Sequence, residues 1–456
     1  MEDFLIEAPW LFIFALIVIP TLKVSGLRLT LFVVFTLLFW GFVGMWEQAM
    51  QTVALMALSV FFSVVFGVLV GIWCSQSKRV EAFVRPILDT MQVMPAFVYL
   101  LPAIFFFGIG GPPAILASMI YAMPPIIRLT NLGIRQVPKE TIETAESFGS
   151  NRIQMLAKIQ IPLALPSIMM GINQTIMMAL GLVVLAAFIG AQGLGYEVWL
   201  AIRRIDVGWA MEAGLCILFM AIMFDRFSAS LGKNEEKVTF TDQLVFRLLP
   251  QSWYKNSLAY LVENLIEKVY KLVNWLASMS VELLSYLIYL VIGIFGREKA
   301  LACKRFLTNH VFTFSFIVVL SLIFFIDLYV FEIGSFPDSW RLSIREPVQI
   351  GVDWLAVNPS FVAFTKGMRA FIYLYMLNPL DYYLLHLPWW FTMISFMIIS
   401  FVTVGLRFAC VAFVLLCFIG ACGIWGESMI TLSSVLVSVA VCFIFGVPLG
   451  VLAAVS

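Results

Sequence analysis

Residues 128–162 read RLTNLGIRQVPKETIETAESFGSNRIQMLAKIQIP and interrupt a sequence built mostly of long apolar runs. Charged residues make up only 12% of the whole chain, yet they recur throughout this stretch. The runs on either side, Pro113–Ile127 and Pro162–Gly181, approach the length of about 20 residues that a straight helix needs to cross a bilayer. We therefore expect a water-exposed loop between two membrane-crossing helices.

The composition of the 456 residues is that of an integral membrane protein. Hydrophobic residues account for 62% and mean hydropathy is +1.00, whereas a soluble domain carries about 25% charged residues. The expected fold class is all-α and membrane-spanning.

A net charge of +1 gives no general attraction to nucleic acid. Seven cysteines without a CxxC pair and two isolated histidines argue against a metal site or a catalytic triad, and the acidic N-terminus argues against a signal peptide.

Apolar runs and basic clusters together predict the orientation. We expect seven spans, at Pro9–Leu22, Leu29–Gly44, Leu55–Cys74, Met94–Ile109, Pro113–Ile127, Pro162–Gly181 and Met211–Phe224. With alternating crossings, the four basic clusters between and after these spans fall on one side, which is the cytoplasm by the positive-inside rule. The loop at 128–162 is then cytoplasmic and the N-terminus is external.

An internal repeat is the clearest feature of the chain's organisation. At a fixed offset of 379 residues, ten positions from Gly44 to Gly71 are identical to positions from Gly423 to Gly450, and Pro9 and Arg28 match Pro388 and Arg407. Such self-similarity without gaps predicts two structural repeats in the same orientation. Seven spans leave the chain on the cytoplasmic side, whereas a second unit in the same orientation must begin outside. One additional crossing is therefore required between the two units.

These observations divide the chain into five parts. We expect a first unit at 1–230, a cytoplasmic amphipathic linker at 231–310, an extra span at 311–331, an external segment at 332–387 and the start of a second unit at 388–456. Whether Val281–Phe295 enters the membrane stays open. Because Ser456 corresponds to Ser77, the second unit is expected to be truncated, and the chain to be a fragment unable to transport by itself.

The loop contains a predicted short helix, Val137–Gly149. Pro138 suits its first turn, Glu140 and Glu143 complement the positive end of its dipole, and Gly149 suits a left-handed terminus. A second helix is expected from about Asn151, with Ser150 as its cap. A short, exposed and partly apolar helix is suited to the groove of another protein, although a solvated connector would have the same pattern.

The residues of this helix resemble a known motif. Glu143-Thr144-Ala145, then Gly149, then Ile161-Pro162, is similar to the EAA motif of binding-protein-dependent importer permeases, with Thr144 in place of the middle alanine and Ile159-Gln160-Ile161-Pro162 around the proline. Over roughly residues 40–230, the segments at 84–127, 128–138, 171–178 and 190–195 resemble the glycine betaine/proline betaine permeases in particular.

The resemblance implies a type I ABC importer permease with a MetI-like helix bundle, in the bacterial inner membrane. Its partners would be ATP-binding subunits, a periplasmic substrate-binding protein and membrane lipid. ATP and Mg²⁺ would be bound by the ATPase, since this chain has no GxxxxGK[ST] loop and needs no cofactor of its own. The residues implied in ATPase coupling are Ile142, Glu143, Ala145, Phe148, Gly149 and Pro162. Arg128, Arg135, Arg152 and Lys158 are either further ATPase contacts or positive-inside anchors.

The solute is less well specified. Polar residues inside spans are costly, so the candidate pathway residues are Gln92, Tyr99, Asn131, Asn173 and Gln174, with helix–helix hydrogen bonding as the alternative role of each. No catalytic residue is expected. A compatible solute such as glycine betaine or proline betaine is favoured, and choline, carnitine or an amino acid are alternatives. An osmosensor or channel working without ATP is a further alternative, which the docking helix argues against.

Overall fold

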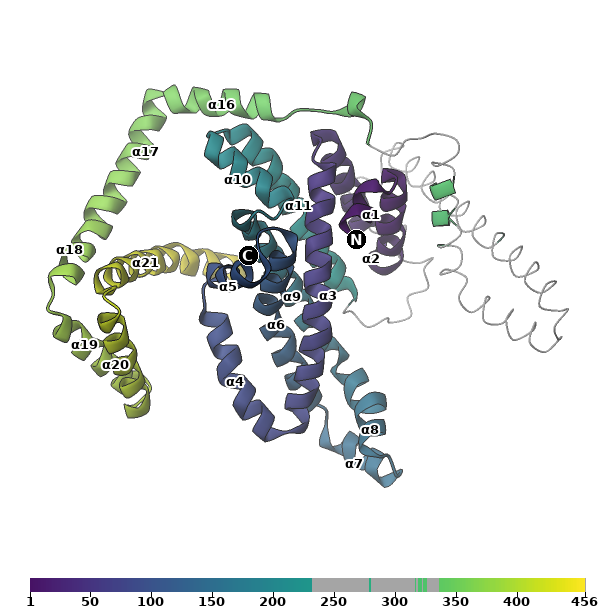
Figure 1. The fold of residues 1–456 in the computed structure, drawn as a ribbon, viewed down its shortest axis with the longest axis horizontal. Coiled ribbons are helices and arrows are strands. Elements are labelled where there is room, and N and C mark those ends of the chain that lie inside the picture. Colours follow the sequence, from purple (N-terminus) through teal and green to yellow (C-terminus); the bar gives the residue numbers. More distant parts are fainter. Residues whose placement is uncertain (232–278, 280–315, 317–318, 322, 326–335, 456) are drawn as a thin grey trace. The chain divides into compact units, whose positions relative to one another are not determined.

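A computed structural model describes residues 1–231, 279, 316, 319–321, 323–325 and 336–455 (Figure 1). The chain divides into two compact units, Met1–Gln349 and Ile350–Ser456. The regular secondary structure of the described residues is helical, and no strand occurs among them. The predicted linker at 231–310 and most of the predicted extra span at 311–331 lie outside the described residues.

The first unit contains the helices that surround the 128–162 loop. They are α1 (Glu2–Glu7), α2 (Trp10–Val43), α3 (Trp46–Gln76), α4 (Lys78–Val93), α5 (Ala96–Phe107), α6 (Gly111–Arg135), α7 (Lys139–Ser147), α8 (Arg152–Met155), the π-helix η1 (Leu156–Gln160), α9 (Ile161–Leu185), the 3-10 helix η2 (Ala186–Ile189), α10 (Leu194–Arg204) and α11 (Val207–Leu231). Of these, α3, α6, the continuous stretch 152–189 and α11 are long and apolar enough to cross a membrane.

Helix α2 is a hairpin that agrees with the two spans predicted there. Gly26 has a left-handed φ of 75° inside the helix and separates Trp10–Gly26 from Arg28–Val43. The rings of Trp10 and Phe42, from opposite ends of α2, lie 5.2 Å and 5.8 Å from the ring of Phe336. The two halves of α2 therefore run antiparallel, because a residue without a side chain permits the reversal.

The span predicted at Met94–Ile109 differs from the structure. Helices α4 and α5 meet at an angle of 101°, and together they have the length and apolarity of one span. Pro95 starts α5 and is incompatible with a continuous α4, because it disfavours helical backbone at Met94. The Tyr99 hydroxyl donates to the Met91 carbonyl oxygen at 2.6 Å across the bend.

Helices α3, α6 and α9 form the centre of the first unit through close backbone contacts. A Cβ atom added at Gly71 of α3 would lie 2.6 Å from the Thr130 Cβ and 2.9 Å from the Ile127 carbonyl oxygen of α6. On the other side of α6, a Cβ at Gly133 would lie 2.7 Å from the Ser167 Cβ of α9. Small residues permit such approach, which is how helices gain packing energy where lipid removes the hydrophobic driving force between them.

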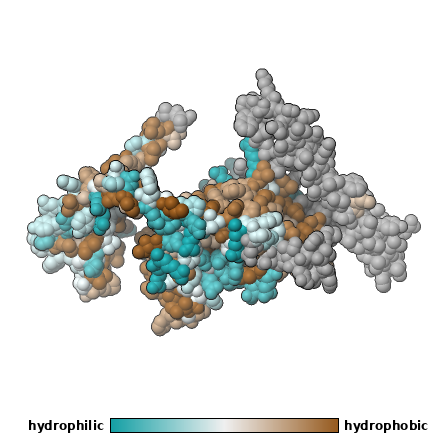
Figure 2. Space-filling view, turned by 90° about the horizontal axis from the view of Figure 1, so that it is seen from above, coloured by the Kyte–Doolittle hydropathy of each residue, from teal (hydrophilic) through white to brown (hydrophobic). Residues whose placement is uncertain are grey.

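On the face that Figure 2 shows, brown apolar patches lie between teal hydrophilic ones. Phe61 on α3 and Phe105 on α5 are 61% and 86% exposed. Exposed aromatic side chains on apolar helices are expected to face lipid.

The second unit reproduces the start of the first. It contains α17 (Pro359–Phe371), the π-helix η6 (Ile372–Leu377), α18 (Asn378–His386), α19 (Trp389–Thr403), α20 (Leu406–Ala421) and α21 (Trp425–Val455), while α16 (Arg345–Val357) begins in the first unit. Left-handed glycines recur at Gly26 and Gly405 and at Gly44 and Gly423, each pair 379 residues apart. The internal repeat predicted from the sequence is confirmed.

The second compact unit begins earlier than the predicted boundary at 388. It starts at Ile350, because α18 and η6 pack against α21, as α1 packs against α3 in the first unit. The predicted external segment at 332–387 is described from Phe336 onward and is largely helical. Its stretch Pro359–His386 combines with Trp389–Thr403, at a bend of 107°, into a pair that is apolar enough for a span.

The repeat offers a matched test of the α3–α6 contact. Gly71→Ala should lower the free energy of unfolding by about 1–3 kcal/mol, because the methyl group overpacks the contact with α6. Gly450→Ala is the control, since a Cβ at Gly450 meets no described atom within 4 Å and alanine has the same intrinsic helix preference at both positions. Thermal unfolding of the purified chain in detergent measures both. Equal effects of the two substitutions would contradict the packing role.

Candidate functional site

The 128–162 loop folds into two short helices that connect α6 to α9. Helix α7 spans Lys139–Ser147, and Pro138 is its N-cap with an extended ψ of 136° rather than a residue of its first turn. Glu140 lies in the first turn, as expected. Figure 1 shows α7 and α8 beyond the ends of α3 and α6, at one extremity of the first unit.

A tight turn joins α7 to α8. Gly149 is left-handed with φ +78°, its N–H donates to the Glu146 carbonyl oxygen at 2.8 Å, and the Ser150 N–H donates to the Ala145 carbonyl oxygen at 3.1 Å. This pattern is the Schellman motif, which satisfies the last carbonyls of a helix and favours glycine at the left-handed position. The predicted role of Gly149 as helix terminator is thus confirmed.

The predicted cap of the second helix is wrong by one residue. Asn151, not Ser150, caps α8, since its side chain accepts from the Gln154 N–H at 2.8 Å and Gln154 in turn accepts from the Asn151 N–H at 3.1 Å. Ser150 has its N–H committed to the turn that ends α7. A reciprocal capping box satisfies two helix N-terminal donors at once.

Two large apolar side chains of the loop are exposed among its polar residues, and no described residue covers them. Phe148 is 87% exposed and Ile153 is 77% exposed, while Ala145 is buried and Ile142 partly buried. Glu143 is exposed, and its carboxylate has no partner among the residues that the structure describes. Sequence reasoning missed Ile153, which follows Phe148 closely and has the same exposed apolar character. Large exposed aromatic groups beside charges are typical of protein-binding surfaces.

The chain continues from the loop into the membrane without a helix break. Pro162 lies in the first turn of α9, directly after the π-helix η1. A proline ring clashes with the carbonyl four residues earlier in an α-helix, and a π-bulge is one way to relieve that clash. Residues 152–189 therefore form one continuous apolar stretch that begins at the loop.

Two of the basic residues predicted as partner contacts are paired inside the chain. Arg135 of α6 pairs with Glu81 of α4 at 2.6 Å and donates to the Cys74 carbonyl oxygen at 2.8 Å. Arg128 of α6 pairs with Asp89 of α4. Positions 128, 131 and 135 share one face of α6, so these pairs form a ladder that joins α4 to α6.

The candidate pathway residues do not converge. Asn131 donates to Glu81 at 3.2 Å within the α4–α6 ladder, and Asn173 of α9 donates to Asp225 of α11 at 3.3 Å and accepts from Ser228. Tyr99 bonds across the α4–α5 bend. Asn131, Asn173 and Tyr99 make helix–helix hydrogen bonds, which was the alternative role predicted for each. Gln92 and Gln174 are exposed.

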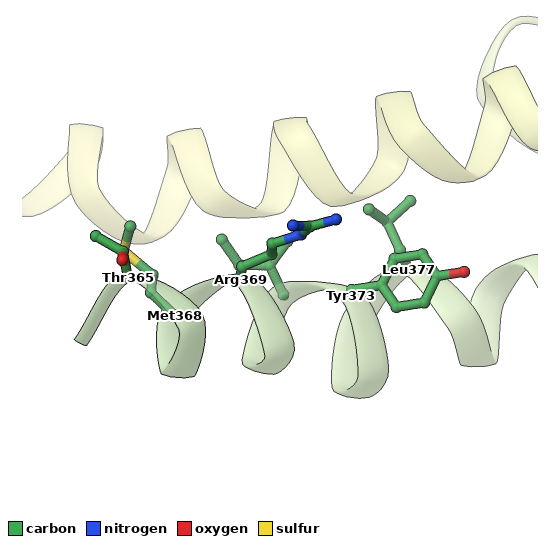
Figure 3. A pocket seen from close by; sticks show the side chains of 6 residues that line it. Thr365, Met368, Arg369, Tyr373 and Leu377 are labelled. Carbon is green, nitrogen blue, oxygen red and sulfur yellow. The ribbon is translucent and has the colours of Figure 1, made fainter. Parts of the chain in front are cut away.

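A hollow of about 370 Å³ lies elsewhere, in the second unit. Its lining side chains all come from α17 and η6, and Figure 3 shows Thr365, Met368, Arg369, Tyr373 and Leu377 among them. None of the candidate pathway residues lines it. No group of three or more His, Cys, Asp or Glu side chains that could hold a metal ion occurs in the described part of the chain.

The α4–α6 ladder can be tested by exchanging its charges. Arg135→Glu or Glu81→Arg alone should destabilise the chain by about 0.5–1 kcal/mol, because the pair is about two-thirds buried and each single change places like charges together. The double exchange should recover most of that loss, measured by thermal unfolding in detergent. Lys158→Glu, at an exposed position, is the control. Additive losses in the double variant would show that the two side chains do not interact.

Comparisons with known proteins agree with this geometry. Residues 63–231 match the family described as binding-protein-dependent transport system inner membrane component. The glycine betaine transport system permease protein OpuAB of Bacillus subtilis is 50% identical over 208 residues, which is 46% of this chain and 74% of that protein. The glycine betaine/proline betaine permease ProW of Salmonella typhimurium is 46% identical over 46% of this chain and 60% of its own length.

One relative aligns with both repeats. The trimethylamine N-oxide transport system permease protein TmoV of Ruegeria pomeroyi is 28% identical over 446 residues, 98% of this chain and 58% of that protein. The alignment continues through the linker and the second unit, in agreement with the internal repeat. The relatives of this chain are transport permeases rather than enzymes. The chain therefore belongs to the family of binding-protein-dependent transport permeases, the inner-membrane components of ABC importers.

Proposed function

We propose that this chain forms the transmembrane pathway of an ATP-driven importer for a small methylated-amine solute such as glycine betaine or proline betaine. The observation that carries the proposal is the pair of exposed apolar side chains at α7 and α8, Phe148 at 87% and Ile153 at 77% exposure. A membrane channel has no need of such a surface on a rigid cytoplasmic loop. A partner ATPase would seat this surface in a groove, and an external binding protein would deliver the solute.

The contacts of the loop support a route for force from the ATPase. Helix α7 follows α6 after a few residues, and α8 continues through η1 into α9. A displacement of the loop would thus move two of the three central helices directly. The Glu81–Arg135 and Asp89–Arg128 pairs would carry the movement of α6 to α4 and the α4–α5 bend. Packed, bistable interfaces convert small shifts at an effector site into rigid-body motion.

Trimethylamine N-oxide is a further candidate solute. The TmoV relative, named for that solute, aligns with 98% of this chain, whereas the betaine permeases OpuAB and ProW align with 46% of it. Betaines and trimethylamine N-oxide share a methylated nitrogen that carries positive charge. Choline and carnitine belong to the same chemical class, and an amino acid would be the remaining alternative.

The docking surface is tested by Phe148→Ala. Binding of the purified ATPase subunit should weaken by roughly ten- to a hundredfold, because a buried aromatic anchor contributes about 2 kcal/mol or more to an interface. The thermal stability of the chain itself should not change, since the side chain is exposed. Phe83→Ala is the matched control, because Phe83 on α4 is 73% exposed and lies outside the loop.

Two further substitutions use the same binding measurement. Gly149→Asp strains the left-handed turn between α7 and α8, and Glu143→Ala removes the exposed carboxylate of α7. Both should weaken capture of the ATPase. An ATPase that binds all three loop variants as it binds the unaltered chain would refute docking at α7.

The solute class is tested by ATP turnover of the reconstituted importer with its binding protein. Glycine betaine, proline betaine, trimethylamine N-oxide, choline, carnitine and an uncharged amino acid are compared at equal concentration. We expect stimulation by at least one methylated amine and none by the amino acid. Stimulation by the amino acid alone would reject the methylated-amine proposal while leaving the importer architecture in place.

A further inference from the structure

Glu212 is a buried carboxylate near the start of the membrane-crossing helix α11. Its residue is only 5% exposed, and one carboxylate oxygen accepts the backbone N–H groups of Ile344 at 2.7 Å and Arg345 at 2.6 Å. An acidic side chain buried in a membrane helix is costly unless it is paired or hydrogen-bonded. Its partners come from a segment more than 130 residues further along the chain.

That segment, Phe336–Gln349, makes polar contacts with α2 and α11 of the same unit. The Leu342 N–H donates to the Phe42 carbonyl oxygen at the end of α2, at 2.7 Å. The side-chain oxygen of Gln349 accepts the N–H groups of Val207 and Gly208 at 3.1 Å and 3.2 Å, so a distant residue satisfies the first donors of α11.

The Arg345 side chain adds an ion pair and a ring contact. Its guanidinium pairs with Asp206 and lies 5.1 Å from the centre of the Trp209 ring. Asp206 also accepts the Trp209 N–H at 2.9 Å. The Trp209 hydrogen bond, with help from Arg345, holds the pKa of the Asp206 carboxyl below its usual range. Asp206 is therefore ionised at neutral pH and available to the guanidinium.

An aromatic contact secures the other end of the segment. The ring of Phe336 is buried between Trp10, Phe42 and Trp46, at centroid distances of 5.2, 5.8 and 6.2 Å. The first unit has glycine where the segment passes closest. A Cβ at Gly41 would lie 2.3 Å from the Phe336 ring, and one at Gly208 would lie 2.2 Å from the Arg345 carbonyl oxygen.

We infer that Phe336–Gln349 is a brace of the first unit, and that Glu212 is the residue that positions it. The brace joins the end of α2 to the start of α11 and fixes the point at which the chain leaves the first unit toward the second repeat. One consequence rests on the proposed function: these ends of α2 and α11 move as one body during transport.

The competing assignment makes Glu212 a counter-ion for a positively charged solute. The two backbone N–H groups on its carboxylate argue against that role, because a solute would have to displace the brace to reach the same oxygen. The two assignments differ in what a change at Glu212 does to Phe336–Gln349 when no solute is present.

Hydrogen exchange of the purified full chain in nanodiscs, without ATP or solute, is the test. In Glu212→Ala, exchange over 336–349 should accelerate about tenfold or more, because the backbone N–H groups of Ile344 and Arg345 lose their shared acceptor. Glu212→Gln should give a smaller acceleration, and peptides of α3 and α6 should be unchanged. Glu346→Gln is the control, since Glu346 is exposed and lies in the same segment. Unaltered exchange over 336–349 in Glu212→Ala would overturn the brace.

A substitution within the brace distinguishes loss of the brace from general misfolding. Gln349→Ala leaves every residue of α2, α3 and α11 in place and should accelerate exchange at 207–208 and over 336–349 together. If Glu212→Ala loosens the whole first unit and Gln349→Ala changes nothing, the brace is rejected. Loss of transport in Glu212→Gln with full protection of 336–349 would assign Glu212 to the solute pathway instead. Because exchange is measured without transport, failure of the proposed function leaves this result unaffected.

Discussion

The close contact of α6 with α3 on one side and with α9 on the other is the constraint on which the first unit depends. Gly71 and Gly133 bring backbones so near that no side chain fits between them. In lipid, where burial of apolar surface between helices gains little, this packing has to supply much of the stability. Polar bonds follow from it, such as the one from the Ser63 hydroxyl to the Met119 carbonyl oxygen at 2.9 Å.

Rigid central helices also explain the form of the loop. Helices α6 and α9 end and begin at the same extremity, so α7 and α8 are held between two fixed points. The Schellman turn at Gly149 and the capping box at Asn151 then satisfy the backbone groups locally. As a result, Phe148 and Ile153 stay exposed on a structured loop. A surface of that kind can transmit force, whereas a flexible loop would absorb it.

The opposite end of the first unit is held by residues from far along the chain. Glu212, Asp206 and the start of α11 are satisfied by Phe336–Gln349, and the Phe336 ring fills the space left at Gly41. The unit is thus constrained at the loop by local capping and at the other end by long-range contacts. Between those ends, the ion pairs from α4 to α6 link the bent pair α4–α5 to the central helices.

The membrane class, the internal repeat, the position of the loop and the left-handed turn at Gly149 could all be predicted from the sequence. These features depend on composition, on identity at a fixed offset and on interactions within a few residues, all of which can be read along the chain. The 101° bend before Ala96 has a local cause in Pro95, although its angle was not predicted. The tertiary structure determined the pairing of Arg128 and Arg135 with α4 and the role of Asn131. It also decided what Glu212 binds, since a buried carboxylate is satisfied by whichever donors the fold brings to it. Contacts between residues 39 to 139 positions apart leave no local pattern, and for that reason they could not be predicted.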